Sequence, residues 1–397
     1  MKARTVLISG ASIAGPALAF WLRRHGFEPT VVERAAALRE GGQAVDFRGE
    51  AHLSVLRRMG LLDATRAKQT NMGEQTFVDA EGKALVTLPA EFMSGDVEIH
   101  RGDLSRILYD ATRETTEYRF GDAIAAMVET PRGVDVRFER GPSRTFDLVV
   151  GADGLHSGVR ALAFGEEGRF LRFLGHYVAG FSLPNHLGLR RRGLIYSEPG
   201  RGVCVANARE PDEARALFVL ASPPMAFDRR DVDAQKRIVT DAFASMRDRR
   251  RWEVPRLLDA MQTAPDLYFD AVARIDLDRV SKGRVTLVGD AAFGGTLGGQ
   301  GTGAAIIGAY VLAGELGAAD GDHRVAFARY EARIRRYATR CQRGASHAGP
   351  FFAPRTPGRL WCRNLMYRVL ASPKLEGVLR SLVTGAADGI VLEDYAA

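Results

Sequence analysis

Three short glycine-rich segments are the part of this chain whose residue types and spacing most clearly indicate chemistry. They span residues 10–15 (Gly-Ala-Ser-Ile-Ala-Gly), 151–154 (Gly-Ala-Asp-Gly) and 289–292 (Gly-Asp-Ala-Ala), and each follows a short apolar run typical of a β-strand. Backbone N–H groups in a tight glycine turn can receive a phosphate. One such segment suggests a phosphate loop, whereas three that lie far apart in the sequence predict one large nucleotide cofactor held by distant parts of the chain.

The first segment has the features of a dinucleotide-binding turn between a strand and a helix. Gly10 permits the tight turn, and Gly15 lets the helix approach the strand closely. Glu33 ends the next predicted strand, where a carboxylate is expected to bind a ribose hydroxyl. Ser12 replaces the middle glycine of the motif. An ordinary strand–helix turn therefore remains the alternative, and the segment alone does not separate NAD from FAD.

The elements that must position these segments follow an α/β pattern. Residues 4–9 and 29–33 are predicted strands around a helix at 13–25, and the same style returns near the third segment. Residues 123–150 are predicted to form a β-meander, and 166–275 is rich in strands. We therefore predict a Rossmann-like nucleotide-binding domain with an inserted β-sheet domain, followed by C-terminal helices.

Two longer stretches give the chain a resemblance to a known family. Residues 147–160 (Asp-Leu-Val-Val-Gly-Ala-Asp-Gly-Leu-His-Ser-Gly-Val-Arg) match the Asp-Gly motif of the class A flavin-dependent aromatic monooxygenases, and residues 289–293 match their Gly-Asp motif. Together with Glu33-Arg34 and Arg101, these matches extend over nearly the whole chain. Within this family, which has the para-hydroxybenzoate hydroxylase fold, the sequence most resembles the tetracycline- and polyketide-tailoring hydroxylases. The resemblance implies that the cofactor is FAD.

The resemblance also implies roles for individual residues. Asp290 is expected to hydrogen-bond the ribityl chain of FAD, and Arg101 is expected to contact FAD. The helix opened by residues 299–303 would direct the positive end of its dipole at the flavin. No metal site is expected. The cofactor-binding set is Gly10, Ala11, Ser12, Ile13, Ala14, Gly15, Glu33, Arg34, Arg39, Asp46, Arg101, Asp153, Gly154, Asp290, Gly301, Thr302 and Gly303.

Two loops bear on the chemistry beside the flavin. A Gly-Gly…Asp segment at 39–49 is similar to one that passes the isoalloxazine in the tailoring hydroxylases, which implies that Asp46 contacts FAD. Arg39 or Arg48 would meet NADPH or substrate, with Arg48 as the catalytic candidate and a polar loop without a role as the alternative. The loop 293–298 departs from the family, because it has phenylalanine first where many relatives have histidine, lacks proline and is one residue short. Its path beside the flavin is left open.

The reaction implied by the resemblance uses NADPH and O₂ to hydroxylate an aromatic or polyketide-like small molecule through a flavin C4a-hydroperoxide. Phe181, Tyr196, Phe218 and Phe269 are candidate pocket walls on predicted strands, with plain core as the alternative. No convincing Ser-His-Asp set, metal-ligand cluster or P-loop lysine stands out. Two other functions remain open: a flavin-dependent reductase or oxidase without oxygen transfer, and a non-catalytic flavin-binding protein.

The order of predicted strands and helices divides the chain into three regions. The FAD-binding domain is expected to comprise residues 1–75, 101–165 and 276–322, and the substrate domain residues 76–100 and 166–275. Residues 323–397 are expected to form a C-terminal helical region.

Composition is that of an ordinary globular protein. The chain has 397 residues, 46% of them hydrophobic, with a net charge of +7. The segment 324–368 holds eleven arginines and one acid, which predicts a solvated helix face, with an anion-attracting face for nucleic acid as the weaker alternative. Three scattered cysteines, no signal-peptide pattern and no apolar run of membrane-spanning length predict a cytoplasmic enzyme, monomeric or homodimeric, without membrane or nucleic-acid partners.

Overall fold

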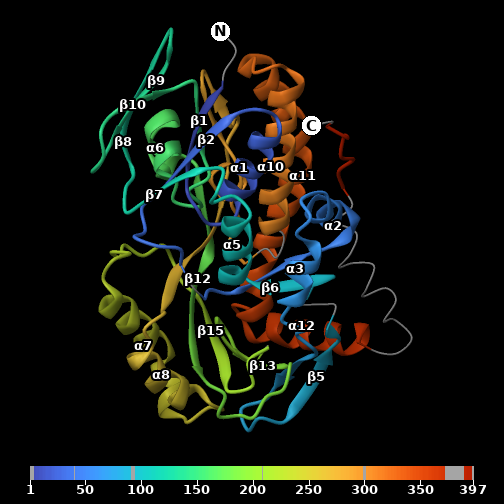
Figure 1. The fold of residues 1–397 in the computed structure, drawn as a ribbon. Coiled ribbons are helices and arrows are strands. Elements are labelled where there is room, and N and C mark those ends of the chain that lie inside the picture. Colours follow the sequence, from blue (N-terminus) through green and yellow to red (C-terminus); the bar gives the residue numbers. More distant parts are fainter. Residues whose placement is uncertain are drawn as a thin grey trace.

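The computed structural model describes residues 4–39, 41–90, 94–207, 209–297, 301–371 and 389–395. One large sheet lies at the end of the molecule that holds the N-terminus and another at the opposite end (Figure 1). The long helix α11 (His323–Phe352) runs from the first toward the second. This mixed α/β architecture confirms the predicted fold class.

The first sheet has six strands in the order β17-β18-β11-β1-β2-β7. All neighbouring pairs are parallel except β17 with β18. Its central strands are continuous apolar runs, as expected for a sheet buried on both faces. Helices α1 (Ala14–Arg24) and α10 (Gly301–Ala318) pack against each other beside it. The strands are β1 (Thr5–Ser9), β2 (Glu28–Glu33), β7 (Glu117–Phe120), β11 (Leu148–Gly151), β17 (Ser281–Lys282) and β18 (Val285–Leu287).

The three glycine-rich segments meet at the carboxyl ends of the parallel strands of this sheet. Ser9 lies beside Gly151 in the register, and Gly151 lies beside Leu287, so the chain leaves β1, β11 and β18 side by side. On the other side Ser9 pairs with Val32, one residue before Glu33. The carboxyl ends of parallel strands form the ligand crevice of open α/β sheets. The topology thus brings together the segments that the sequence separates.

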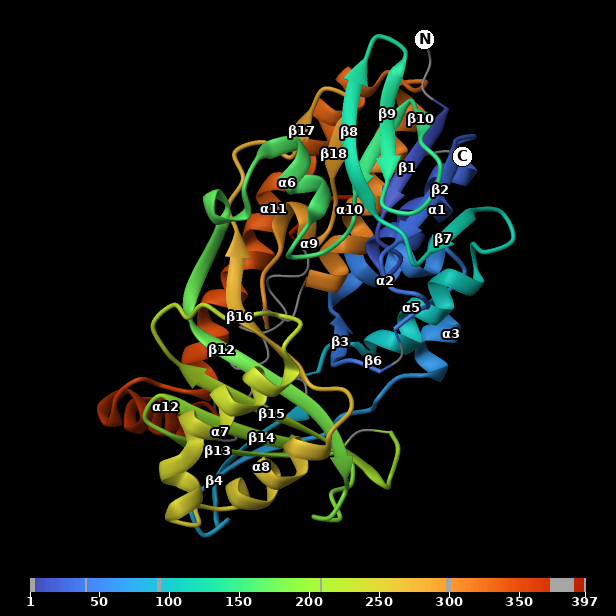
Figure 2. The ribbon, with the colours of Figure 1, turned by 90° about the vertical axis from the view of Figure 1, so that its left-hand side faces the viewer.

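The second sheet has seven strands in the order β16-β12-β15-β14-β13-β4-β5. Helices α7 (Val232–Asp248) and α8 (Val254–Thr263) cover one face through an apolar cluster (Figure 2). Helix α12 (Pro357–Leu370) and the end of α11 pack on the other face. The strands are β4 (Gln75–Val78), β5 (Ala84–Leu88), β12 (Leu171–Pro184), β13 (Gly193–Glu198), β14 (Arg201–Ala206), β15 (Glu213–Ala221) and β16 (Tyr268–Ile275).

The predicted β-meander at 123–150 is only partly correct. Strands β8, β9 and β10 form an antiparallel sheet, but β11 belongs to the large parallel sheet. Asp147 marks the division, because its carboxylate accepts the N–H of Thr5 at 2.9 Å and so fastens the chain to β1. The smaller elements are β3 (Ala44–Phe47), β6 (Val97–His100), β8 (Ile124–Thr130), β9 (Gly133–Phe138), β10 (Arg144–Phe146), α2 (Gly49–Arg58), α3 (Leu62–Ala67), α5 (Arg101–Asp110), α6 (Gly158–Phe164), η1 (Glu167–Arg169) and α9 (Asp290–Phe293).

Helix α10 is long and apolar enough to cross a membrane by length and composition. From the sequence we expect no apolar run of membrane-spanning length, and this segment contains several glycines and Glu315. In the structure 72% of the helix is buried inside the protein, where it packs against α1, α2 and α11. It is placed as a core helix of the first sheet.

Arginines of the basic segment 324–368 hold the C-terminal helices in place. Arg335 donates to the carbonyl oxygen of Leu277 at 3.0 Å and pairs with Glu331. Arg363 lies with its guanidinium carbon 4.3 Å from the ring centroid of Phe77, and burial lowers its pKa to about 10. These contacts favour a structural use of the basic charge.

Candidate active site

The glycine turn after β1 has the geometry that its sequence predicts. Gly10 has a φ of +110°, and a Cβ there would lie 2.5 Å from the carbonyl oxygen of Ala152. A Cβ at Gly15 would lie 1.9 Å from the carbonyl oxygen of Gly10, so only glycine fits in this turn of α1. The turn therefore presents backbone N–H groups and the start of a helix, a combination suited to a pyrophosphate.

Glu33 is fixed at the carboxyl end of β2, next to this turn. One carboxylate oxygen accepts the N–H of Ala11 and the other the N–H of Ala35, both at 2.9 Å. The carboxylate is therefore held beside the glycine turn, the place expected for a ribose-binding acid. Arg34 is exposed and pairs with Glu139 at 3.7 Å.

Arg160 connects the second glycine segment to the third. Its side chain is 1% exposed and donates hydrogen bonds to the carbonyl oxygens of Leu155 at 2.7 Å and Ala291 at 3.0 Å. In the same loop Asp153 accepts a 2.5 Å hydrogen bond from the Ser157 hydroxyl. Burial, opposed by that hydrogen bond, raises the pKa of Asp153. Here Asp153 shapes the loop, with Gly154 beside it at a φ of +82°.

Asp290 offers a carboxylate to the site from the start of α9. Solvent reaches its side chain. The surrounding protein still removes part of its hydration, which raises the pKa of the carboxyl, and the charge of Arg101 opposes this shift. Arg101 begins α5; burial and the charge of Arg39 lower its pKa, while Asp290 and Glu33 oppose this. Arg101 therefore interacts electrostatically with both carboxylates, Asp290 and Glu33. An accessible but partly desolvated carboxylate is suited to binding ligand hydroxyls.

The start of α10 lies against Asp290. A Cβ at Gly301 would lie 3.3 Å from Oδ1 of Asp290, and Gly301, Thr302 and Gly303 form the first turn of the helix. Of the loop predicted to approach the flavin, residues 298–300 lie outside the described residues.

Gly303 is required by the packing of a buried histidine. A Cβ there would come within 2.1 Å of the His52 ring. His52 Nδ1 accepts the N–H of Arg48 at 3.0 Å, and Nε2 bonds the Tyr337 hydroxyl. Burial and the charge of Arg48 lower the pKa of His52 to about 4, so the ring is neutral at physiological pH.

Asp46 and Arg48 form an ion pair beside this histidine. Asp46 is 5% exposed and Arg48 9%, and the Arg48 Nε donates to the carboxylate. Glu98 lies opposite Asp46 in the β3–β6 ribbon. Burial and the charge of Asp46, opposed by a hydrogen bond from Thr70, raise the pKa of Glu98 to about 7. The predicted contacts of Asp46 with FAD, and of Arg48 with NADPH or substrate, stay predictions.

Comparisons with known proteins agree with this geometry. Residues 3–345 match the model of a family described as "FAD binding domain". The chain belongs to this family. A flavin-dependent monooxygenase of Legionella longbeachae is 38% identical over 337 residues, which cover 84% of this chain and 85% of that protein. A protein of Mycobacterium tuberculosis is 43% identical over 361 residues, covering 88% of this chain and 95% of that protein. The solved structure of the tetracycline destructase Tet(55) is 34% identical, covers 99% of both chains and has a TM-score of 0.84.

Membership of this family makes the chain a FAD-dependent enzyme of the flavin monooxygenase type. The residues present fit the cofactor. Adjacent strand ends supply the glycine turn, Glu33 and the accessible Asp290, and the start of α5 supplies the cation of Arg101, which interacts with both carboxylates. An extended dinucleotide needs hydrogen-bond donors and acceptors at several separate positions. The glycine turn, Glu33, Asp290 and Arg101 provide them.

The aromatic side chains predicted to wall the substrate pocket are core residues instead. Phe181, Tyr196, Phe218 and Phe269 are at most 5% exposed and pack beneath α7 and α8. Successive side chains of a strand point to opposite faces. The face toward the flavin-binding residues therefore carries their neighbours, among them the cross-strand set Gly180, Leu217 and Tyr268. The alternative interpretation of plain core is confirmed.

Sequence reasoning missed the polar residues that join the two sheets. His156 lies inside the Asp-Gly stretch but had no assigned role, and its ring contacts Asp270 and Glu167. Tyr268 is one residue before Phe269, and the sequence pattern favours Phe269 as the pocket wall. Strand alternation anchored on the buried aromatic face would have identified Tyr268 and Asp270 as the residues facing the site.

Proposed function

We propose that this enzyme uses NADPH and O₂ to hydroxylate a large, flat, polycyclic phenol or enol. The observation that carries the proposal is the sheet face opposite the flavin-binding residues. There Leu217, Gly180 and Tyr268 lie side by side across three strands, and the Gln43 side chain lies over the glycine in the middle of the row. A floor with an apolar side chain at one end, an amide over its middle and a phenol at the other end suits a polycyclic guest with polar edges.

A second observation supports a polar contact above this floor. The Gln43 side-chain nitrogen is buried and has no hydrogen-bond partner among the described residues, and it lies 3.1 Å from where a Cβ of Gly180 would be. Buried donors are nearly always paired in native proteins. Because protein atoms alone already cover this nitrogen, we expect the Gln43 side chain to turn before it bonds a ligand oxygen, from either the flavin or the substrate.

The role of the protein is to bind, orient and exclude water. FAD, when bound, supplies the redox chemistry that carries electrons from NADPH to O₂. The glycine turn would hold its pyrophosphate, Glu33 its ribose, and Asp290 its ribityl hydroxyls. Arg101 would offset negative charge beside them. Arg48 is buried and paired with Asp46. We keep Arg48 as the candidate that contacts NADPH or substrate.

The names of the relatives support the substrate class. The chain is 34% identical to a tetracycline destructase along its whole length, and tetracyclines are polycyclic phenols and enols. We keep the predicted domain boundaries and the cytoplasmic monomer or homodimer as part of this proposal.

NADPH oxidation by the FAD-loaded protein tests the proposal. A panel of tetracyclines and aromatic polyketides is added, and each product is analysed by mass spectrometry. We expect at least one compound to accelerate NADPH oxidation and to gain one oxygen atom. Stimulated NADPH oxidation that yields only hydrogen peroxide with every compound would favour the oxidase alternative, and a reduced product without added oxygen the reductase.

A further inference from the structure

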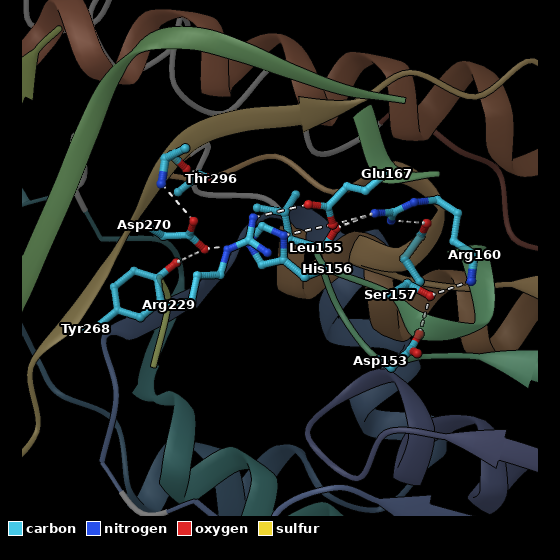
Figure 3. Close-up of polar contacts among 12 residues, drawn as sticks. Asp153, Leu155, His156, Ser157, Arg160, Glu167, Arg229, Tyr268, Asp270 and Thr296 are labelled. Carbon is cyan, nitrogen blue, oxygen red and sulfur yellow. Dashed lines mark hydrogen bonds and ion pairs between the residues drawn. The ribbon is translucent and has the colours of Figure 1, made fainter. Parts of the chain in front are cut away.

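A histidine clamped between two carboxylates links the Asp-Gly loop to the second sheet. His156 Nδ1 lies 2.9 Å from Glu167, and Nε2 lies 2.8 Å from Oδ2 of Asp270 (Figure 3). Asp270 is on β16, and Glu167 begins η1. The Asp270 carboxylate is 8% exposed, and that of Glu167 29%. The imidazole thus connects a buried acid to one that reaches solvent.

The buried end of this connection faces the flavin-binding residues. The Tyr268 hydroxyl donates to Oδ2 of Asp270 at 3.4 Å. The Tyr268 side chain is 44% exposed, although burial and the charge of Asp270 raise its pKa. Its phenol interacts electrostatically with Arg101 and Asp290, which are both charged residues of the candidate FAD site. Tyr268 therefore borders the space between the sheet and the flavin-binding edge.

The outer end is anchored by arginines. Arg229 donates to Glu167 Oε1 at 3.1 Å, and its side chain is 48% exposed. Arg160 donates to Glu167 Oε2 at 3.4 Å from its buried position in α6. Burial opposes the effect, but hydrogen bonds from His156 and Arg229 lower the pKa of Glu167 to about 2. Glu167 stays ionised, so it accepts protons briefly and passes them to water.

We propose that Tyr268 is a catalytic residue that bonds the substrate hydroxyl, and that Asp270, His156 and Glu167 are positioning residues that carry the substrate proton to solvent. This inference rests on the proposed function, because a phenol or enol reacts with electrophilic oxygen more readily as its anion. The chain of contacts runs from the flavin side of the sheet to the surface without a gap among these four side chains.

The proton count balances without any further reactant. The substrate O–H breaks as the Tyr268 oxygen takes that proton, while the Tyr268 hydroxyl gives its own to Asp270. His156, as imidazolium, releases its Nδ1 proton to Glu167, which passes it to water. One proton leaves the substrate and one enters solvent, so the charge of the four-residue cluster stays the same. The negative charge that the lost proton leaves behind resides on the substrate, and none is added to the partly buried side chains, where it would be costly.

The charges around His156 support its protonated form. Burial lowers its pKa, but the hydrogen bonds and charges of Asp270 and Glu167 outweigh this and raise it above the ordinary value. The charged and titratable groups around this chain are Asp270, Glu167, Tyr268, Arg160 and Arg229, together with Arg101 and Asp290 at the Tyr268 end. The Tyr268 bond is longer than an ordinary O–H···O contact, and catalytic hydrogen bonds tighten when substrate binds.

The chain offers a matched control on the opposite face of the same sheet. The Tyr196 hydroxyl donates to Glu198, two residues further on, at 2.8 Å, as that of Tyr268 does to Asp270. Both are tyrosine–carboxylate pairs on strands of one sheet, but Tyr196 lies in the core beneath α8. Tyr196→Phe therefore removes the same bond without touching the proposed relay.

The first experiment measures turnover with tetracycline as the probe. For Tyr268→Phe we expect kcat to fall about 100-fold with KM changed less than about threefold. Asp270→Asn and His156→Gln should each lower kcat about tenfold and displace the limbs of the pH profile, whereas a merely structural contact would leave the pH profile unchanged. Tyr196→Phe should stay within about twofold of wild type. Equal losses in Tyr268→Phe and Tyr196→Phe, or an unshifted pH profile in both relay variants, would overturn the proposal.

The second experiment needs no substrate. Nitrogen-15 NMR of labelled histidine follows the titration of His156 in the FAD-loaded protein. We expect the pKa to lie above 6.5 in wild type, to fall by at least about one unit in Asp270→Asn, and to change in Tyr268→Phe but not in Tyr196→Phe. An identical His156 titration in all four proteins would contradict the coupled chain. If this coupling is observed while tetracycline is not oxidised, the substrate assignment fails and the relay stands.

Discussion

The buried guanidinium of Arg160 donates a 3.0 Å hydrogen bond to the carbonyl oxygen of Ala291, although 131 residues separate them in the chain. Through this bond helix α6, which follows β11, is fixed to helix α9, which follows β18. Because the same guanidinium also bonds the carbonyl oxygen of Leu155, it sets the spacing between two of the three segments that surround the cofactor. The relative position of the segments is therefore held by one side chain, as well as by strand pairing.

Replacing Arg160 should loosen both segments at once. Arg160→Met leaves the buried carbonyl oxygen of Ala291 and the partly buried one of Leu155 without their donor, and an unsatisfied buried acceptor costs about 1–3 kcal/mol. We expect the free energy of unfolding in urea to fall by about that amount and FAD to be lost on gel filtration. Arg137→Met, at an exposed position on β9, is the control and should change neither. Full FAD retention by Arg160→Met would show that strand pairing alone holds the site.

The start of α10 should not tolerate a methyl group at position 303. In Gly303→Ala the new Cβ would meet the His52 ring at 2.1 Å, and neither that ring nor the buried helix has room to move. Overpacking of this kind costs about 1–3 kcal/mol. We expect a lower melting temperature and weaker FAD binding by fluorescence quenching. Gly358→Ala in α12 meets nothing within 4 Å and should be neutral or slightly stabilising.

The sequence was sufficient for the parts of the molecule that local pattern determines. Gly10 and Gly15 could be interpreted from the chain because a tight strand–helix turn leaves few alternatives. The pocket-facing residues could not, since Tyr268 and Phe269 are adjacent aromatic residues and only the position of α7 and α8 decides which one is buried. The ion pair of Asp46 with Arg48 depends on the β3–β6 ribbon, and no short sequence motif predicts that these two side chains pair. Long-range contacts such as Arg160 with Ala291 need the sheet topology first.

Glu98 should make stability depend on pH near neutrality. Its folded pKa of about 7 lies above the ordinary value of 4.5, so its neutral form is favoured in the fold. That stabilisation is complete below pH 4.5 and is lost as the pH rises through about 7, because the buried carboxyl must then ionise. Glu98→Gln should therefore be more stable than wild type at pH 8, by up to about 3 kcal/mol, and lose that advantage at pH 4. Urea unfolding at both pH values measures the difference.

Asp290 should contribute to FAD affinity through its charge. Asp290→Asn keeps the size of the side chain but removes a charged acceptor, and such hydrogen bonds are worth about 1.5–3 kcal/mol. We expect the dissociation constant of FAD to rise about 10- to 100-fold in an equilibrium titration. Asp278→Asn, an exposed acid in the same part of the chain, should bind FAD like wild type. Equal affinity in both variants would remove Asp290 from the cofactor site.

The central claim is that the chain transfers oxygen from O₂ to a polycyclic phenol or enol. The most direct measurement incubates the FAD-loaded protein with NADPH, tetracycline and ¹⁸O₂ and analyses the product by mass spectrometry. The claim predicts one ¹⁸O atom in the product, NADPH consumption that depends on tetracycline, and loss of both in a protein stripped of FAD. Tetracycline recovered without label, while NADPH is consumed and hydrogen peroxide accumulates, would contradict it.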